Sequence, residues 1–285
     1  MTFIILSVLL NSLLFVILKA FSKFNIDTLT ALVVNYGTAF GIGYFMTGDY
    51  SFSKVIESEW LYSSLLLGFL FILVFFATAI TAQRNGLSVA SVASKMSVII
   101  PIGMGVFFFK DALGFLKIIG VVLALFAVFL TSKKESGTVA LKNQFLWPML
   151  VFFGAGLIDG SLKLVQHFYL QNDDTYLFTT NTFLIAFIIG SLILLFKIKK
   201  NPSIFKTRNV LAGIALGIPN FFALYYMIKM LGHETWDTST IFTVHNVAIV
   251  LLTTAVGIAL FREKISITNG LGIVLALISI ALMTL

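Results

Sequence analysis

Three charged side chains lie deep inside long apolar stretches of this 285-residue sequence: Lys95, Asp159 and Lys163. A charge at the centre of a lipid bilayer costs about 2.5–3.5 kcal/mol on insertion scales, so such a residue needs a partner or a function. The chemistry that a buried lysine and a buried carboxylate offer is ion pairing, recognition of a charged small molecule and proton transfer. These residues are therefore the first candidates for a functional site.

Lys95 stands eight residues after Leu87, where its apolar stretch begins. On a helix this separation is about 12 Å, at about 1.5 Å per residue, so the ammonium cannot easily reach the membrane surface. Two interpretations remain open. In the first, which we favour, Lys95 faces a central cavity and binds an anionic group or a carboxylate partner. In the second, it pairs structurally with backbone carbonyls or with a helix dipole.

Asp159 and Lys163 are four residues apart with the acid first, which is the favourable order for an ion pair on one helix. Such a pair can neutralise itself and serve the structure alone. Asp159 is also the one carboxylate deep within an apolar stretch, so it is the candidate for a group that gains and loses a proton inside the membrane. The sequence leaves both roles open.

Amides and one histidine also occur in apolar stretches. His245 and Asn246 lie about two turns into one stretch, and Asn220 lies within the stretch before it. Each either lines a polar cavity or bridges helices, and bridging or packing is the more common role of a single such residue. The candidate residues for substrate or ion binding are Lys95, Asp159, Lys163, Asn220, His245 and Asn246.

Ten apolar runs carry these residues, at about 2–20, 29–46, 60–82, 87–109, 113–131, 145–170, 176–197, 210–231, 239–261 and 267–285. A membrane-spanning helix needs about 20 apolar residues, and it satisfies every backbone hydrogen bond within itself. With 59% hydrophobic and 11% charged residues, the chain leaves no room for a soluble domain. The runs predict an all-α membrane protein with ten transmembrane helices.

The net charge of +7 does not indicate nucleic-acid binding, because the basic residues lie mostly in the connections between apolar runs. They are most frequent after odd-numbered runs, as in the connections 132–144 and 197–209. By the positive-inside rule these connections are cytoplasmic and both termini lie outside. The expected partners are the lipid bilayer and a small molecule, with no nucleic acid.

An internal repeat divides the chain. Segment 109–125 matches segment 261–277 without a gap, at an offset of 152 residues, and both begin with a Phe-basic-acidic triplet. We infer a first five-helix repeat at 1–131, a linker loop at 132–144 and a second five-helix repeat at 145–285. Five is an odd number, so the repeats cross the membrane in opposite senses, and a binding site is expected at mid-depth between them.

These features resemble the drug/metabolite transporter superfamily, EamA type, which has two five-helix repeats with an acidic residue after each fourth helix. Here the usual Gly-Glu pair is replaced by Lys110-Asp111 and by Arg262-Glu263. The resemblance covers nearly the whole chain. It implies a secondary carrier, commonly an exporter of small metabolites, that works without ATP hydrolysis.

Two further patterns concern the helices themselves. Gly120-xxx-Ala124 and Gly272-xxx-Ala276 place small residues on the fifth and tenth runs, which predicts that these helices pack closely together. Pro101 and Pro219 are expected to kink the fourth and eighth runs.

Enzyme motifs are missing from the sequence: there is no His-Glu-x-x-His, no Gly-x-Ser-x-Gly and no phosphate loop. Cysteine is also absent, which excludes disulfides and thiolate metal sites. We expect no catalytic residues, metal or cofactor. The predicted function is secondary, proton-coupled transport of a small organic metabolite across the cytoplasmic membrane, by a monomer or a homodimer. The alternative is a non-transporting membrane subunit or sensor on the same scaffold, with its polar residues fully paired.

Overall fold

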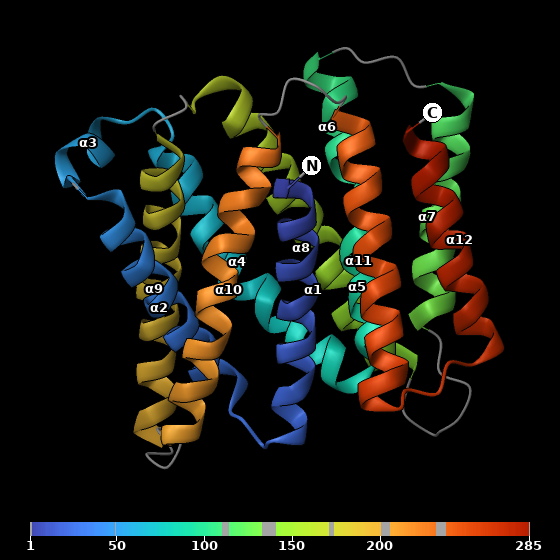
Figure 1. Cartoon of the computed structure of the whole chain (residues 1–285), viewed down its shortest axis with the longest axis horizontal. Coiled ribbons are helices and arrows are strands. Elements are labelled where there is room, and N and C mark those ends of the chain that lie inside the picture. Colours follow the sequence, from blue (N-terminus) through green and yellow to red (C-terminus); the bar gives the residue numbers. More distant parts are fainter. Residues whose placement is uncertain are drawn as a thin grey trace. The chain divides into compact units, whose positions relative to one another are not determined.

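The computed structural model describes residues 2–48, 50–109, 114–132, 141–170, 174–200, 206–231 and 238–284. Lys110, Asp111 and most of the predicted linker lie outside these ranges. The secondary structure of the described residues is helical: α1 (Thr2–Lys23), α2 (Thr28–Thr47), α3 (Phe52–Glu57), α4 (Leu61–Arg84), α5 (Leu87–Met96), α6 (Ile99–Phe109), α7 (Phe115–Ser132), α8 (Leu141–Phe168), α9 (Asp174–Lys200), α10 (Thr207–Leu231), α11 (Thr238–Phe261) and α12 (Ile267–Thr284) (Figure 1).

The predicted all-α membrane class is confirmed. Nine segments of the described residues are long and apolar enough to cross a membrane, and α5 and the beginning of α6 count as one of them. The tenth predicted run forms α12, whose described apolar part, Ile267–Leu282, is shorter than the others. Helix α3 was not predicted, because only Val55 among its six residues is buried.

The fourth apolar run is interrupted rather than merely kinked. Helix α5 ends at Met96 and α6 begins at Ile99, so the break falls at Ser97 and Val98. Pro101 has no N–H to donate to the carbonyl oxygen of Ser97, four residues earlier. The N–H of Ile100 donates to that oxygen instead, at 2.9 Å, in a tighter turn. By contrast, α10 continues as a helix through Pro219.

The chain forms two compact units. The first unit is Met1–Phe76 with Ser161–Gly232, and the second unit is Ala77–Gly160 with His233–Leu285. Helices α4 and α8 each contribute to both units. The units cut across the predicted repeats 1–131 and 145–285, so the compact units and the sequence repeats are different divisions of the chain.

The first unit is built around α2, which packs against α9 and α10, while α1 packs on α10. Close approach of α10 depends on glycine, because a Cβ at Gly217 would lie 2.6 Å from the carbonyl oxygen of Asn35 on α2. The hydroxyl of Tyr36, which is fully buried, donates to the carbonyl oxygen of Phe71 on α4 at 2.7 Å. The polar groups inside this unit therefore hold neighbouring helices in register.

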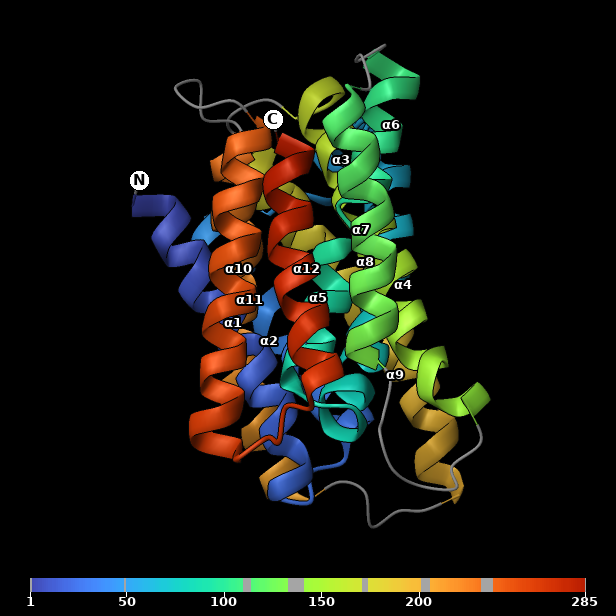
Figure 2. The ribbon, with the colours of Figure 1, turned by 90° about the vertical axis from the view of Figure 1, so that its right-hand side faces the viewer.

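The second unit is organised by the close packing of α7 on α12, shown side by side in Figures 1 and 2. The Ser279 hydroxyl near the end of α12 donates to the carbonyl oxygen of Gly120 near the start of α7, at 2.7 Å. The Asn269 amide near the start of α12 donates to the carbonyl oxygen of Thr131 at the end of α7, at 2.8 Å. The two helices therefore run antiparallel, and the predicted packing of these two runs is confirmed.

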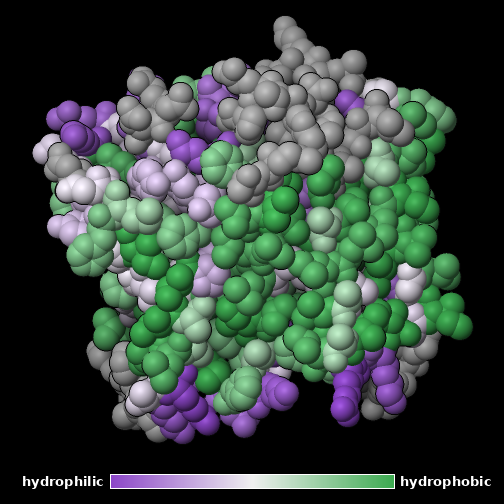
Figure 3. Space-filling view, viewed as in Figure 1, coloured by the Kyte–Doolittle hydropathy of each residue, from purple (hydrophilic) through white to green (hydrophobic). Residues whose placement is uncertain are grey.

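The outward faces of these helices are apolar. On α12 the exposed large side chains Ile267, Leu271, Val274 and Ile278 follow one another at helical spacing. Figure 3 shows such apolar side chains covering much of the face turned to the viewer, with hydrophilic side chains gathered towards the helix ends. A helix surface of this kind suits contact with lipid, since apolar side chains in contact with lipid have no unfavourable free energy of hydration.

Candidate functional site

Four of the six predicted site residues come together in the second unit. Lys95 lies in the last turn of α5, Asp159 lies on α8, and His245 and Asn246 lie on α11. The Lys95 ammonium interacts electrostatically with the Asp159 carboxylate and also with His245. A ring nitrogen of His245, Nδ1, lies 3.4 Å from the Asn246 amide oxygen.

The site is largely buried. Lys95 is 6% exposed, Asn246 is 3% exposed and His245 is fully buried, whereas Asp159 is half-buried. Removing one partner of a buried ion pair costs about 3–5 kcal/mol, because the other charge is left without compensation. An ionised Lys95 without an anion beside it is therefore costly, and Asp159 is the anion that the fold supplies.

Two glycines on α8 bring Asp159 close to the interruption of the fourth run. A Cβ at Gly156 would lie 2.8 Å from the carbonyl oxygen of Ser97, and one at Gly160 would meet the sulfur of Met104. Asp159 lies beside Gly160 and one turn after Gly156. The Gly156-xxx-Gly160 spacing is a known signal for close helix approach, and it was visible in the sequence although no prediction was based on it.

The other two predicted residues lie in the first unit. The Asn220 amide on α10 donates to the Asn35 side-chain oxygen on α2 at 3.1 Å, so Asn220 bridges two helices. The amide nitrogen of Asn35 is buried and has no hydrogen-bond partner among the described residues. Lys163 is half-buried and lies one turn beyond Asp159 on α8. Its pairing with Asp159 stays a prediction.

A hydrogen bond at the start of α5 was also not foreseen. The backbone N–H of Leu87 donates to the Glu263 carboxylate, at 2.7 Å from Oε1. Glu263 belongs to the Arg-Glu pair after α11, which the sequence marked as a repeat motif without indicating a structural role. The end of α11 and the beginning of α5 therefore lie together within the second unit.

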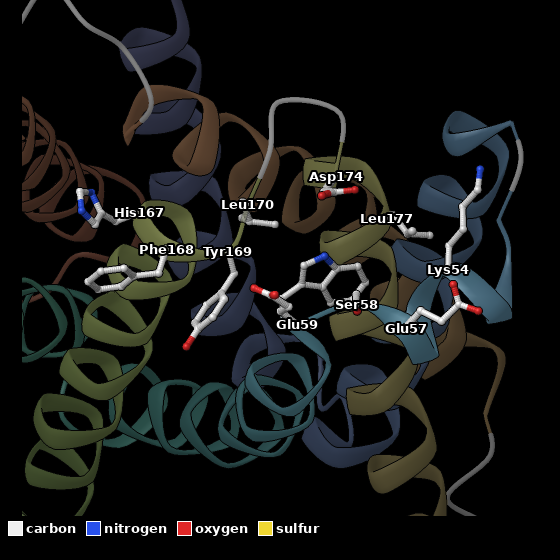
Figure 4. A pocket seen from close by; sticks show the side chains of 11 residues that line it. Lys54, Glu57, Ser58, Glu59, His167, Phe168, Tyr169, Leu170, Asp174 and Leu177 are labelled. Atoms are coloured by element: carbon white, nitrogen blue, oxygen red, sulfur yellow. The ribbon is translucent and has the colours of Figure 1, made fainter.

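A cavity of about 680 Å³ lies in the first unit, away from the predicted residues (Figure 4). It lies between α3, the beginning of α4 and the facing ends of α8 and α9. Its lining residues are Lys54, Glu57, Ser58, Glu59, Trp60, His167, Phe168, Tyr169, Leu170, Asp174 and Leu177. None of the six candidate residues lines this cavity. The cavity is formed by residues at the ends of the spans, and the buried charged residues do not take part in it.

Comparison with known proteins shows similarity to one family, to one bacterial protein and to one solved structure. Residues 146–285 match the model of the EamA-like transporter family. An uncharacterised protein of Haemophilus influenzae is 28% identical over 284 residues, which are 97% of this chain and 95% of that protein. A solved crystal structure has the same fold, with a TM-score of 0.64 at 16% sequence identity, over 99% of this chain and 94% of that chain.

Apolar helices of spanning length, together with this family match, define a multi-pass integral membrane protein of the drug/metabolite transporter class. The members of this class are transporters rather than enzymes, and they act on small molecules in a lipid bilayer. The second part of the chain, residues 146–285, matches the EamA-like transporter family, and the resemblance inferred from the sequence is confirmed.

Proposed function

We propose that this protein is a secondary active exporter of a small organic metabolite that carries an anionic group, in the cytoplasmic membrane. The proposed substrate anion binds Lys95, and Asp159 is the coupling group that binds the proton. His245 and Asn246 are proposed to complete the site from α11. The observation that carries the proposal is the buried interaction of Lys95 with Asp159 directly beside a broken membrane helix.

The proposed cycle follows from the need of Lys95 for an anion. When the Asp159 carboxylate is ionised, it neutralises Lys95 and the site is closed to substrate. When Asp159 binds a proton, Lys95 loses its partner and takes the substrate anion instead, so the proton and the substrate cross together and the outward concentration gradient of the substrate drives export. A change of one pKa unit corresponds to about 1.4 kcal/mol, so a small rearrangement between these groups couples the two binding events.

We further propose that the chain has ten spans in two inverted five-helix repeats. The antiparallel course of α7 and α12 supports this, because these helices occupy equivalent places in the two sequence repeats. Helices α5 and α11 are also antiparallel. The beginning of α5 meets the residues after α11, while Lys95 near its end interacts with His245 near the beginning of α11. Helices of equivalent repeats run oppositely in inverted transporters.

The alternative, a non-transporting membrane subunit, is favoured by one observation. Lys95 is almost fully buried and already has a carboxylate partner, as a purely structural lysine would. The two functions differ in what happens when the pair is removed. Removal of a purely structural pair from a non-transporting subunit would leave solute levels unchanged. Removal of a substrate-binding pair from a transporter would abolish export.

Metabolite profiles of cells and of their medium test the proposal. We compare cells without the protein, with the wild type and with Lys95→Ala, and use Lys54→Ala on the exposed helix α3 as the matched control. The wild type and the control are expected to accumulate the same anionic metabolite in the medium, and Lys95→Ala is expected not to. Equal export by Lys95→Ala, at equal amounts of folded protein, would overturn the role of Lys95. No difference between wild type and empty cells would favour the subunit.

A further inference from the structure

Helix α5, which carries Lys95, is short, with a glycine directly before it and a break in the helix directly after it. It has ten residues, ends at the break at Ser97, and begins directly after Gly86. The residue before the helix, Gly86, has no side chain with which to cap it. A first turn without a cap leaves backbone N–H groups unsatisfied, and inside an apolar protein such groups need an acceptor.

Glu263 supplies that acceptor from a distant part of the chain. Its Oε1 accepts the N–H of Leu87 at 2.7 Å, and Leu87 is fully buried. A carboxylate at a helix N-terminus is also favoured electrostatically, because the helix dipole is positive there. The N-terminal cap of α5 is therefore provided by the connection between α11 and α12.

The backbone around the carboxylate is shaped to receive it. A Cβ at Gly257 would lie 2.8 Å from Glu263 Oε2, and a Cβ at Gly86 would lie 3.3 Å from the same atom. Gly86 also has φ = 121°, which residues with a Cβ rarely adopt. The N–H of Glu263 donates to the carbonyl oxygen of Gly257 at 3.0 Å, and Arg262 before it has φ = 52°. The chain thus turns back sharply so that the carboxylate enters between the two glycines.

We propose that Glu263 is a positioning residue for Lys95. It joins the beginning of α5 to the end of α11, the helix that carries His245, and it fixes the position of α5 along its own axis. With that end held, the last turn of α5 keeps Lys95 beside Asp159 and His245. The inference rests on the proposed role of Lys95, but the position of Lys95 can be measured without transport.

The experiment uses the absence of native cysteine. Lys95→Cys gives the full-length protein a single thiol, and its rate of modification by a small cationic methanethiosulfonate in detergent reports how accessible this position is. We combine it with Glu263→Ala, with Glu263→Gln, which keeps an acceptor oxygen, and with Gly257→Ala, whose Cβ would displace the carboxylate. Glu57→Ala on the exposed helix α3 is the matched control.

Glu263→Ala and Gly257→Ala are expected to raise the modification rate about tenfold, which is the scale of losing an N-terminal cap. Glu263→Gln and the control are expected to stay within about twofold of the parent. Equal rates in the parent and in both disruptive variants, measured on monodisperse protein, would overturn the proposal. If only one disruptive variant gives monodisperse protein, its rate decides.

Export measurements separate this inference from the proposed function. With native Lys95, Glu263→Ala is expected to lose export as Lys95→Ala does, and Glu263→Gln is expected to restore most of it. If the thiol rates change as expected and the wild type exports nothing, Glu263 positions α5 but the proposed function is wrong. If export is normal in Glu263→Ala while the thiol rate is unchanged, the positioning role is wrong and the proposed function stands.

Discussion

Asp27 links three elements of the first unit, and replacing it tests how much this link stabilises the fold. Its carboxylate caps α2 by accepting the N–H of Thr30 at 2.9 Å, and it pairs with the Lys197 ammonium of α9 at 2.6 Å. Its own N–H donates to the Asn209 side chain on α10 at 3.1 Å. Burial raises the pKa of Asp27, but Lys197 and the donors of Thr30 outweigh burial, so the pKa lies below its usual value.

The expected loss of stability on replacing Asp27 follows from the two roles of its side chain. Losing an N-terminal cap costs about 1 kcal/mol, within about 0.5–2 kcal/mol. The ion pair adds about 0.2–1 kcal/mol, because its partners are partly exposed, at 41% for Lys197 and 27% for Asp27. Asp27→Ala is therefore expected to lower the free energy of unfolding by about 1–3 kcal/mol. Asp27→Asn keeps an acceptor for the cap and is expected to lose the smaller part.

The stabilisation that Asp27 contributes depends on pH, and the direction follows from its lowered pKa. Because the folded-state pKa of Asp27 is lowered, its contribution is present above the unfolded pKa of about 3.9 and is lost as the pH falls through the lowered folded value. Thermal unfolding in detergent, followed by tryptophan fluorescence at pH 7 and at pH 3, measures this. The difference in thermal stability between the wild type and Asp27→Asn is expected to be smaller at pH 3 than at pH 7. A difference that stays constant, or additive effects of Asp27→Asn and Lys197→Ala, would refute the ion-pair explanation.

Three further predictions concern coupling, topology and packing. Asp159→Asn is expected to abolish accumulation of the profiled metabolite in inside-out vesicles when the imposed pH gradient is acidic outside the vesicles, while sparing its counterflow exchange, since the amide cannot titrate; accumulation at the wild-type rate would contradict this. In intact cells, an impermeant thiol reagent is expected to label Ser53→Cys and not Ser22→Cys, because the positive-inside rule places the connection at Ser22 in the cytoplasm; the reverse pattern would invert the topology. Gly217→Ala is expected to destabilise the protein by about 1–3 kcal/mol, measured by thermal unfolding, because its Cβ would lie 2.6 Å from the Asn35 carbonyl oxygen.

The apolar runs were enough to predict the membrane-spanning segments, because spanning length and hydrophobicity are local properties of the chain. Pro101 predicted a distortion of the fourth run, but its form depended on neighbours that a single run does not contain. The break at Ser97 lies against Gly156 of α8, so α8 helps to determine how the chain passes the proline. Helix α3 was missed for the opposite reason, since it is too short and too polar to show a run.

The candidate site was predicted in part. Lys95 and Asp159 were identified from charge in an apolar setting, and His245 and Asn246 were identified as polar side chains about two turns into an apolar stretch. The division of the candidates between two compact units was not predictable from spacing, and it leaves Asn220 bonded to Asn35. Glu263 was visible as a repeated acidic residue, but its partner is the N–H of Leu87, and no side-chain type in the sequence marks a backbone donor.

The position of Lys95 in the last turn of α5 has an energetic consequence. The carbonyl groups at the end of a helix carry a partial negative charge of about half an elementary charge, and unlike a carboxylate they keep it at every pH. Part of the compensation of the Lys95 charge therefore comes from the backbone and is permanent. This lowers the energy of the species in which Asp159 is neutral and no substrate is bound, so the empty, protonated carrier is an accessible intermediate rather than a forbidden one.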